Sequence, residues 1–499
     1  MPNNHVDVLI IGAGLSGIGA ACHLRRECPN KSFAILEGRE AMGGTWDLFR
    51  YPGIRSDSDM FTLGYSFRPW TEPKVIADGS SIRNYIQETA REYDVEKHIR
   101  YGHMVKSASW SSKNATWTVT AERKDGKKTR MTANFVIMCT GYYKYAAGYT
   151  PDFPGRDNFK GTFIHPQHWP EDLDYSGKKV VVIGSGATAV TLVPAMAKDA
   201  GHVTMLQRSP SYVATVPEVD EISVRLRRFL PEKVVYRLAR TRNVGLQMAV
   251  YNLSKKRPKV VRRLLLGMAR KQLGKDFDMS HFSPSYNPWD ERLCAVPDGD
   301  LFKVLRKGEA SVVTDHIDTF TENGIKLKSG KELEADIIIS ATGLDLQLFG
   351  GMKVTIDGKA HDINQSTAYK ALMLSDVPNA ALIFGYTNAS WTLKADISSE
   401  YICRLLKHMD RTGTRQATPR MNDASVSQEP FIDMQSGYFQ RAKHKFPKQG
   451  SKAPWKLKQN YVADLANLRY SKVDDGIMEF SNPASADNAD ESEPKRASA

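Results

Sequence analysis

Two glycine-rich loops, each set between a short apolar run and a helical pattern, most constrain the fold of this 499-residue chain. The first follows the run of residues 7–11 and reads G-x-G-x-x-G over residues 12–17. The second follows residues 179–183 and reads G-x-G-x-x-A over residues 184–189. A short apolar run is typical of a strand buried on both faces, and strand, glycine loop and helix together mark a dinucleotide-binding βαβ unit. The sequence therefore predicts an α/β fold with two Rossmann-like domains.

The first unit indicates which nucleotide it should hold. Its glycines allow a tight turn and a close approach of the pyrophosphate, and the helix N-terminus supplies free N–H groups. Glu37 ends the next predicted strand, residues 33–36. A carboxylate there accepts both ribose hydroxyls and repels a 2′-phosphate, so this site should bind FAD or NAD and not NADP. The predicted contacts of this loop are Gly12, Gly14, Ser16 and Gly17.

The second unit carries a cation where the first has its acid. The strand predicted over residues 203–206 leads to Arg208 and Ser209. A planar guanidinium suits a 2′-phosphate, which favours NADPH, although an arginine closing a strand can also be a plain surface residue. The predicted contacts of this unit are Gly184, Ser185, Gly186, Ala187, Thr188, Ala189, Val190, Arg208 and Ser209.

Two long motifs accompany these loops. The first lies between them and consists of Phe159, Gly161, His165, Trp169 and Pro170. The second is Gly43-Gly44-Thr45-Trp46-x4-Tyr51-Pro52-Gly53-x3-Asp57. Taken alone, the first could be an interdomain loop whose aromatic side chains merely pack, and the second a turn with a surface acid. Together they resemble the signatures of flavin-dependent (class B) monooxygenases of the Baeyer–Villiger type, and within that group the ethionamide-activating monooxygenases.

The resemblance implies a fold, two cofactors and a chemistry. By this resemblance we expect an NADPH-binding domain inserted in an FAD-binding domain. We also expect that NADPH reduces FAD, that O₂ then forms a C4a-peroxyflavin, and that ketones are converted to esters or lactones. Sulfur in thioethers and thioamides should be oxidised as well. Arg292 is implied as the essential cation that stabilises peroxide and oxyanion, with Asp57 holding it near the flavin and Arg55 near the nicotinamide. Further cofactor contacts implied in this way are Thr45, Trp46, Asp47, Ser56, Asp57 and Val105.

One departure from the family pattern concerns cofactor choice. Many relatives have Lys-Arg where this chain has Glu291-Arg292. Arg208 and Ser209 should therefore carry more of the discrimination between NADPH and NADH.

The order of the segments predicts the domain boundaries. The FAD-binding domain takes residues 1–147 and 344–481, and the NADPH-binding domain takes residues 148–215 and 287–343. A basic helical insert fills residues 216–286, and residues 482–499 read as a disordered tail.

The positive charge is concentrated in the predicted insert. Residues 225–275 hold sixteen Lys or Arg and a single acid, Glu232, an excess larger than the formal net charge of +13 of the whole chain. Solvated helices that cap the NADPH-binding domain are one interpretation, and a basic amphipathic surface in peripheral contact with a membrane is another. No recognised nucleic-acid-binding module accompanies the charge, so no nucleic-acid partner is expected.

The cysteine spacing and the distribution of apolar residues indicate in which cell compartment the protein works. The five cysteines form no C-x-x-C pair, which disfavours a disulfide scaffold, a zinc site and a dithiol mechanism, and no other metal site is predicted. No apolar run of membrane-spanning length and no signal peptide is predicted, so we expect a cytoplasmic enzyme.

Two other functions remain open. A flavin-containing N- or S-monooxygenase would share both Rossmann units but would not need Arg292. A membrane-docking flavoprotein without oxygenase activity would also account for the basic insert. The oligomeric state and the preferred ketone or sulfide do not follow from the sequence.

Overall fold

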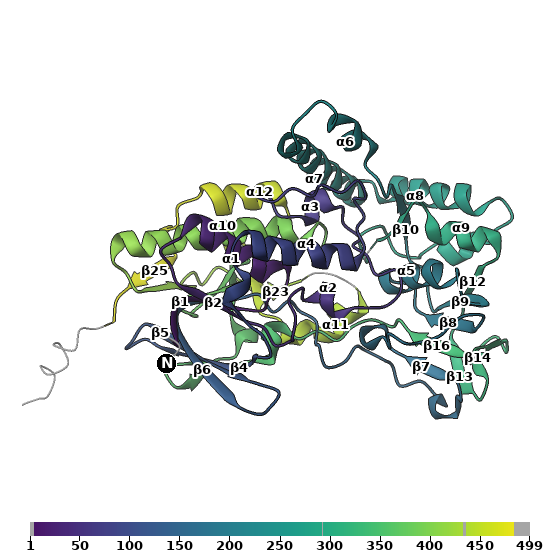
Figure 1. The fold of residues 1–499 in the computed structure, drawn as a ribbon, viewed down its shortest axis with the longest axis horizontal. Helices are drawn as coiled ribbons and strands as arrows, with labels where there is room; N and C mark the ends of the chain where they lie inside the picture. The colour runs from purple at the N-terminus through teal and green to yellow at the C-terminus, as the bar shows by residue number, and fades with distance from the viewer. Residues whose placement is uncertain (1–3, 292, 433–435, 484–499) are drawn as a thin grey trace, which may run out of the picture.

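The computed structural model describes residues 4–291, 293–432 and 436–483. Arg292 and residues 484–499 of the predicted tail lie outside the described residues. Within them the chain forms two large sheets, of nine and five strands, with helices packed around each, and several smaller sheets (Figure 1). Each of these two sheets contains a different one of the two predicted strand–loop–helix units, which confirms the predicted α/β fold.

The larger, nine-stranded sheet contains the first unit. Its order is β18-β17-β4-β5-β6-β1-β2-β3, and β21 pairs with β6. Strands β1 (His5–Ile11), β2 (Phe33–Leu36), β3 (Ile99–Arg100), β6 (Lys128–Met138) and β21 (Ala380–Leu382) are parallel, as a Rossmann unit requires. Strands β4 (Met104–Ser111) and β5 (Thr116–Glu122) extend it as an antiparallel meander, followed by β17 (Lys353–Ile356) and β18 (Lys359–Ala360).

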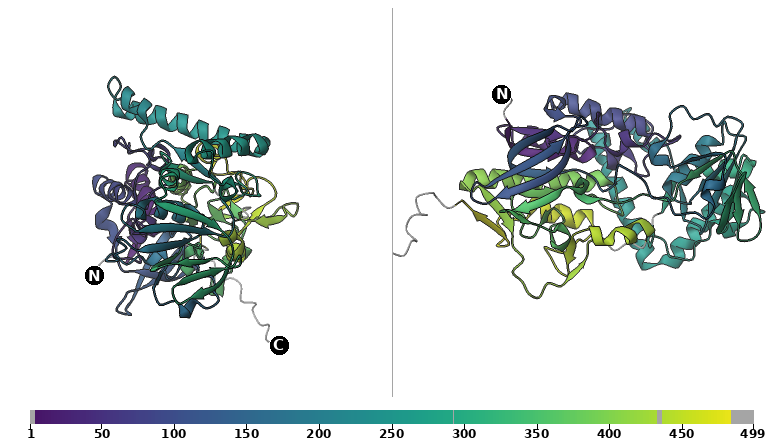
Figure 2. Two further views of the ribbon diagram at one scale, coloured as in Figure 1. Left: turned by 90° about the vertical axis from the view of Figure 1, so that its right-hand side faces the viewer. Right: turned by 90° about the horizontal axis from the view of Figure 1, so that it is seen from below.

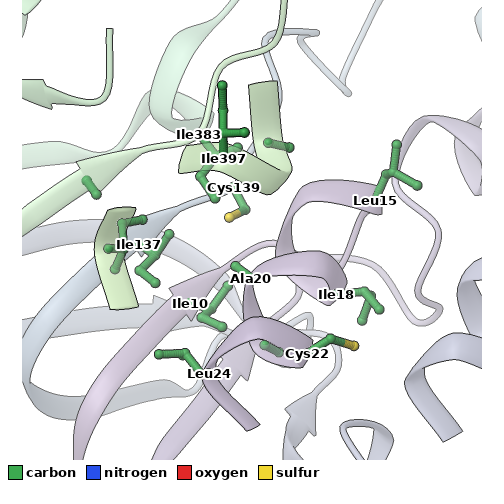
Figure 3. Close-up of a cluster of buried hydrophobic side chains, with 14 of the residues drawn as sticks. Ile10, Leu15, Ile18, Ala20, Cys22, Leu24, Ile137, Cys139, Ile383 and Ile397 are labelled. Carbon is green, nitrogen blue, oxygen red and sulfur yellow. The ribbon is translucent and has the colours of Figure 1, made fainter. Parts of the chain in front are cut away.

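Strand β1 is buried on both faces because a packed layer covers each side. Val8 and Ile10 belong to the cluster formed with helices α1 (Leu15–Glu27) and α10 (Trp391–Thr412). Figure 3 shows this cluster, with Ile10, Ile18 and Ile397 contributed by the strand and the two helices. Leu9 and Ile11 face the opposite cluster with Trp110 and Trp117 of the meander. This arrangement accounts for an apolar run without polar alternation.

The smaller, five-stranded sheet contains the second unit. Its order is β12-β9-β8-β16-β7 and all its pairs are parallel. The strands are β7 (Thr162–Ile164), β8 (Lys179–Ile183), β9 (His202–Gln207), β12 (Ala310–Thr314) and β16 (Ile337–Ser340). Val180 and Val182 pack with helix α5 (Ala187–Met196), and Val181 and Ile183 pack toward the sheet of β13 (Ile317–Thr321), β14 (Gly324–Leu327) and β15 (Glu332–Glu334).

The chain crosses twice between the two sheets, and the two crossing segments pair with each other. The first crossing segment begins after β6, at residue 139, and the second crossing segment begins after β16, at residue 341. Tyr143 bridges to Leu346, the Lys144 amide donates to the Asp345 carbonyl, and Lys144 forms an ion pair with Asp345 at 3.1 Å. This crossing is the predicted insertion of one nucleotide-binding unit into the other.

The basic insert forms helices α6 (Glu221–Leu226), α7 (Glu232–Lys256) and α8 (Pro258–Leu273), at the upper edge of the molecule in Figure 1. One of the two interpretations of this segment was a set of helices that cap the NADPH-binding domain. Helix α8 does so, packing on α9 (Asp300–Lys307) and β10 (Val213–Val216). Helix α7 instead packs on α3 (Met60–Leu63), beside the FAD-binding unit. The insert therefore contacts both units.

Most of the remaining helices and strands are short. They are α2 (Thr45–Leu48), α4 (Gly79–Glu92), α11 (Gly437–Ala442), α12 (Tyr461–Leu465), β11 (Cys294–Pro297), β19 (Ala368–Tyr369), β20 (Met373–Leu374), β22 (Gln416–Pro419), β23 (Gln428–Pro430), β24 (Lys448–Gly450) and β25 (Met478–Ser481). Figure 2 shows the same elements from two further sides, with the two sheets at opposite ends of the long axis in its right-hand view. No described helix is long and apolar enough to cross a membrane.

Candidate active site

A cavity of about 690 Å³ runs from the first glycine loop toward the second nucleotide-binding unit. Its wall begins at the carboxyl ends of β1 and β2, where ligands bind in open parallel sheets. The predicted site residues on this wall are Gly12, Gly14, Ser16, Glu37, Thr45, Trp46, Arg55, Ser56, Asp57, Val105 and Thr188. One cavity therefore gathers residues from both glycine loops and from the second long motif.

The first loop has the geometry that its glycines were expected to allow. Gly12 has a φ of +105°, and a Cβ there would lie 2.5 Å from the Cys139 carbonyl oxygen. A Cβ at Gly17 would lie 1.9 Å from the Gly12 carbonyl oxygen. Gly17 thus serves the packing of α1 on β1 and does not line the cavity, while α1 begins directly after Gly14 and directs its N-terminus at the wall. This is the cradle that a pyrophosphate requires.

Glu37 lies on the same wall, next to the first glycine loop. Its carboxylate accepts hydrogen bonds from the amides of Ala13 at 2.7 Å and Arg39 at 2.8 Å. Burial raises the pKa of Glu37, and these two amide bonds oppose the rise. The carboxylate is therefore fixed between the loop and the end of β2, in the position that binds a ribose. These residues fit FAD.

The second long motif reaches the cavity through residues on either side of its turn. Trp46 lies in α2, directly after Gly43 and Gly44, and Arg55, Ser56 and Asp57 lie beyond the turn. Asp47 does not line the cavity. It is buried and pairs with Arg39 at 2.7 Å and Arg50 at 2.6 Å. In the described structure Asp47 thus holds the start of the second long motif in place through its ion pairs with Arg39 and Arg50.

The turn between these segments is pressed against the second nucleotide-binding unit. Gly53 has a φ of +75°, and a Cβ there would lie 2.7 Å from the Ala195 Cβ and 3.1 Å from the Thr191 carbonyl oxygen of α5. Burial raises the pKa of Tyr51, and a hydrogen bond with Thr188 opposes the rise. The motif therefore connects the two units as well as lining the cavity.

Arg55 makes a second connection between the units. Its Nη1 donates to Asp300 Oδ2 at 2.6 Å, and Asp300 is the first residue of α9. Among the described side chains, its Nε is buried without a hydrogen-bond partner. Arg55 thus presents one unsatisfied donor beside the cavity, which agrees with a polar ligand at that point.

The second glycine loop has the expected backbone. Gly184 has a φ of +139°, and a Cβ there would lie 2.4 Å from the Ala341 carbonyl oxygen. Gly186 is exposed and precedes α5, so the first amides of that helix face outward. The side chains of Ala189 and Val190 are buried against the sheet, and the Val190 amide bonds to Gly186.

The two residues expected to bind the 2′-phosphate follow β9. Arg208 and Ser209 are both exposed, and the Ser209 carbonyl accepts a hydrogen bond from Ser185 at 3.0 Å. Burial raises the pKa of Glu291, and the charge of Arg208 opposes that rise. The acid that departs from the family pattern thus acts electrostatically on the predicted phosphate-binding arginine. A loop, a helix N-terminus and a guanidinium fit NADPH.

The motif around His165 lies away from the cavity and joins the crossing segments. His165 Nδ1 accepts from the Gln167 amide at 3.2 Å, so the proton resides on Nε2, which donates to the Gly343 carbonyl at 3.0 Å. Its ring lies against Gly148, where a Cβ would come within 2.0 Å of it. His165 therefore holds the first crossing segment against the second.

The other residues of that motif pack on the smaller sheet and on the elements around it. A Cβ at Gly161 would lie 2.4 Å from the Asp336 carbonyl oxygen, Phe159 packs on Phe320, and Trp169 packs against the core of the smaller sheet. Pro170 is partly exposed and follows directly. None of the five lines the cavity described above.

Some cavity residues were missed by the sequence analysis. The first crossing segment contributes Thr140, Gly141, Tyr142, Tyr143, Lys144, Tyr145 and Ala146. The segment that leads into α10 contributes Tyr386, Ala389 and Trp391. Trp391 Nε1 donates to Ser16 Oγ at 2.7 Å, which ties α10 to the first glycine loop. For the residues of the first crossing segment, the available signal in the sequence was Gly141, which follows shortly after the apolar end of β6.

Comparison with known proteins agrees with this site. The sequence model of the flavin-binding monooxygenase-like family matches residues 63–442, and a model of an NAD(P)-binding Rossmann-like domain matches residues 10–72. The chain belongs to the flavin-binding monooxygenase-like family. It is thus a flavin-dependent monooxygenase, and FAD and NADP(H) are the cofactors that its two nucleotide-binding units fit.

Several curated relatives match nearly the whole chain. The putative FAD-containing monooxygenase MymA of Mycobacterium tuberculosis is 56% identical over 488 residues, which is 97% of this chain and 99% of that protein. The probable FAD-binding monooxygenase AlmA of Acinetobacter baylyi is 55% identical over 95% of this chain and 96% of its own. The FAD-containing monooxygenase EthA of Mycolicibacterium smegmatis is 54% identical over 98% and 99%.

Solved structures show the same fold at lower identity. An open crystal structure of cyclohexanone monooxygenase has a TM-score of 0.70 at 22% identity and covers 83% of this chain and 90% of that one. An oxidised steroid monooxygenase bound to NADP has a TM-score of 0.70 at 21% identity, with 83% and 88% covered.

Proposed function

We propose that this protein is a Baeyer–Villiger monooxygenase, which uses NADPH and O₂ to convert ketones to esters or lactones and also oxidises sulfur in thioethers and thioamides. The observation that carries the proposal is the single cavity that joins the first glycine loop and Glu37 to Arg55, Ser56 and Asp57. The EthA relative is an FAD-containing monooxygenase, which supports the same class.

Different residues would bind the two nucleotides. The α1 N-terminus and Gly14 would hold the FAD pyrophosphate, and Glu37 its ribose. Reduced FAD, when bound, supplies the electrons that activate O₂. In the second unit the α5 N-terminus would hold the NADPH pyrophosphate and Arg208 its 2′-phosphate.

The proposed catalytic residues are Arg292 and Asp57. An arginine cannot lose its proton near neutral pH, so it can stabilise the oxyanion that forms when oxygen adds to a ketone. Asp57 lies on the cavity wall and would orient the guanidinium by a charge-assisted hydrogen bond. Arg292 lies outside the described residues, between Glu291 and Leu293.

Oxygenation of nitrogen or sulfur alone is the competing function. It needs an electrophilic, protonated oxygen donor and no stabilised oxyanion, so Arg292 would be dispensable for it. Ketone turnover therefore separates the two functions.

The test compares Arg292→Ala with Arg306→Ala, an exposed arginine of α9 that serves as the matched control. Reduced enzyme is mixed rapidly with O₂ and then with a ketone or a thioether, which bypasses reduction by NADPH. We expect Arg292→Ala to keep its flavin but to lose ketone oxygenation by at least about 10²-fold, the scale for one oxyanion-stabilising donor. Thioether oxidation should fall less. Ketone oxygenation at the wild-type rate would remove Arg292 from the mechanism.

The proposal also covers partners and location. A ketone or sulfide and O₂ are the proposed small-molecule partners, with no nucleic acid. The enzyme would work in the cytoplasm, and the charge of residues 225–275 supports peripheral contact of the insert with a membrane.

A further inference from the structure

The helices of the insert expose large apolar side chains to an unusual extent. Of the twelve large apolar residues that are exposed in the described chain, ten lie on or between α6, α7 and α8. Phe229, in the turn between α6 and α7, is 82% exposed, and Leu246 of α7 is 61% exposed. We call these ten residues the apolar ridge: Ile222, Phe229, Val234, Leu238, Leu246, Val250, Leu253, Val260, Leu264 and Met268. Clustering of this kind marks an interaction surface, since isolated exposed apolar residues are ordinary.

On α8 the ridge has helical spacing. Val260, Leu264 and Met268 follow one another at every fourth residue, so they lie on one side of the helix. Val261, Ala269 and Leu273 of the same helix are buried against the protein. The helix therefore has one apolar side for the core and a second for another partner.

The segment that carries the ridge also carries many basic side chains that are exposed to solvent. Twelve of the sixteen Lys and Arg residues in 225–275 are exposed. Eleven of these, all but Lys255, form no ion pair with any described residue. They are Arg225, Arg228, Lys233, Arg237, Lys256, Arg257, Lys259, Arg263, Arg270, Lys271 and Lys275.

The opposite side of the insert is fixed firmly, so the exposed side chains do not reflect a loosely packed segment. Arg240 of α7 is buried, and its Nη1 donates to the carbonyls of Phe61 at 2.8 Å and Gly64 at 2.7 Å. Asn243 donates to Asp59 at 2.9 Å. On α8, Arg262 donates to the Tyr212 hydroxyl at 2.8 Å.

We propose that the apolar ridge and its basic surround dock this enzyme on the surface of an anionic lipid bilayer, with the ridge inserted among the lipids. Apolar side chains within a basic surface are what an interfacial helix needs, because the first enter the acyl boundary and the second bind anionic headgroups. A second copy of this chain fits poorly, because a symmetric contact would bring two strongly positive surfaces together. Nucleic acid would not bury the ridge.

This docking would place the bilayer one helix away from the cavity. Val244, on the inner side of α7, packs with Tyr386 and Leu393, and Met248 and Ala389 pack against them. Tyr386 and Ala389 line the cavity. The diameter of a helix with its side chains is about 10–12 Å. The inference rests on the membrane contact in the proposed function and is independent of the oxygenation chemistry.

The experiment is flotation of the purified, FAD-loaded full chain with vesicles of phosphatidylglycerol or of phosphatidylcholine. The ridge variant carries Phe229→Ser, Leu238→Ser, Leu246→Ser and Leu264→Ser, and the charge variant carries Arg228→Gln, Arg237→Gln, Lys259→Gln and Arg263→Gln. The matched controls are Tyr470→Ser, which is 74% exposed outside the insert, and Lys326→Gln with Lys331→Gln on the small β13–β15 sheet.

We expect wild type and controls to float with phosphatidylglycerol vesicles and much less with phosphatidylcholine. The charge variant should bind at least about 10²-fold more weakly, since one basic residue near an anionic surface contributes about fivefold. The ridge variant should also bind more weakly, because it removes the apolar side chains that enter the acyl boundary. Binding should also fall between 0.1 and 1 M salt, where the screening length shrinks from about 10 to about 3 Å.

Unchanged flotation of both variants, or equal binding to the two lipids, would overturn the proposal. A ridge variant that changes only the oligomeric state would assign the surface to a second copy instead. Flavin content and NADPH oxidation are measured in parallel. A protein that floats as expected but oxygenates no ketone keeps the docking surface and loses only the proposed chemistry.

Discussion

Gly53 shows how a single residue can join two nucleotide-binding units. It combines a positive φ with contact on α5, and each feature excludes a Cβ for a different reason. Gly126, in the turn between β5 and β6, has a similar φ of +77°, but a Cβ there would have no atom within 4 Å, so it isolates the conformational cost. We expect Gly53→Ala to be less stable than Gly126→Ala by about 1–3 kcal/mol, the cost of overpacking. Thermal unfolding of both variants measures the difference, and equal midpoints would contradict the packing argument.

The choice of nicotinamide cofactor is also decided at the residue scale. Arg208 is expected to attract the 2′-phosphate, while Glu291, which Arg208 influences electrostatically, is expected to repel it. Arg208→Ala should therefore raise KM for NADPH by about tenfold and leave NADH nearly unchanged, because only the phosphate contact is lost. Glu291→Gln should lower KM for NADPH. Steady-state rates with both cofactors provide the measurement, and parallel changes with NADH would remove both residues from the 2′-phosphate site.

At the scale of elements, a buried charge network fastens α1, α7 and α10 together. Asp396 of α10 contacts His23 of α1 at 3.4 Å and Arg240 of α7 at 3.2 Å. His23 also contacts Glu27 at 3.1 Å. Burial alone would lower the pKa of His23, but the hydrogen bonds to Asp396 and Glu27 raise it to about 9. The protonated imidazole thus contributes to the stability of the folded chain.

This network predicts a pH dependence with a definite sign. The stabilisation by His23 is fully present below pH 6.5, the pKa of an unfolded histidine, and is lost as the pH rises to about 9. It amounts to at most roughly 3 kcal/mol. The midpoint temperature for thermal unfolding of wild type should therefore decrease as the pH rises from 6.5 to 9. In His23→Gln this decrease should be smaller. His316→Gln, at an exposed histidine, is the control. An unchanged slope in His23→Gln would show that the network does not hold this proton.

Sequence patterns predicted the elements that have a local cause and missed those that depend on distant contacts. The apolar runs before Gly12 and Gly184 and the acid at Glu37 follow from the chemistry of one βαβ unit, and the structure has them as expected. Tyr142 reaches the cavity only because the two crossing segments pair. The position of α7 depends on Arg240, whose carbonyl partners lie far away in the sequence.

At the scale of the whole molecule, the docking surface and the cavity lie on opposite sides of one helix. Helix α7 exposes Leu246 and Val250 on its outer side, and Val244 on its inner side packs next to cavity-lining Tyr386. A docked enzyme would therefore take an apolar ketone from the bilayer, where such a ketone is concentrated, over a short path. A ketone that stays in water would gain nothing from docking.

We therefore expect phosphatidylglycerol vesicles to lower the apparent KM for a long-chain ketone that partitions into them and to leave that for a short, water-soluble ketone unchanged. Both values are measured as ketone-dependent NADPH oxidation with product analysis, in wild type and in the charge variant of the insert. The variant should lose the vesicle effect and keep wild-type turnover of the soluble ketone, because its substitutions lie on the outer surface. A vesicle effect of equal size for both ketones, or one that persists in the charge variant, would show that the bilayer does not deliver substrate through this face.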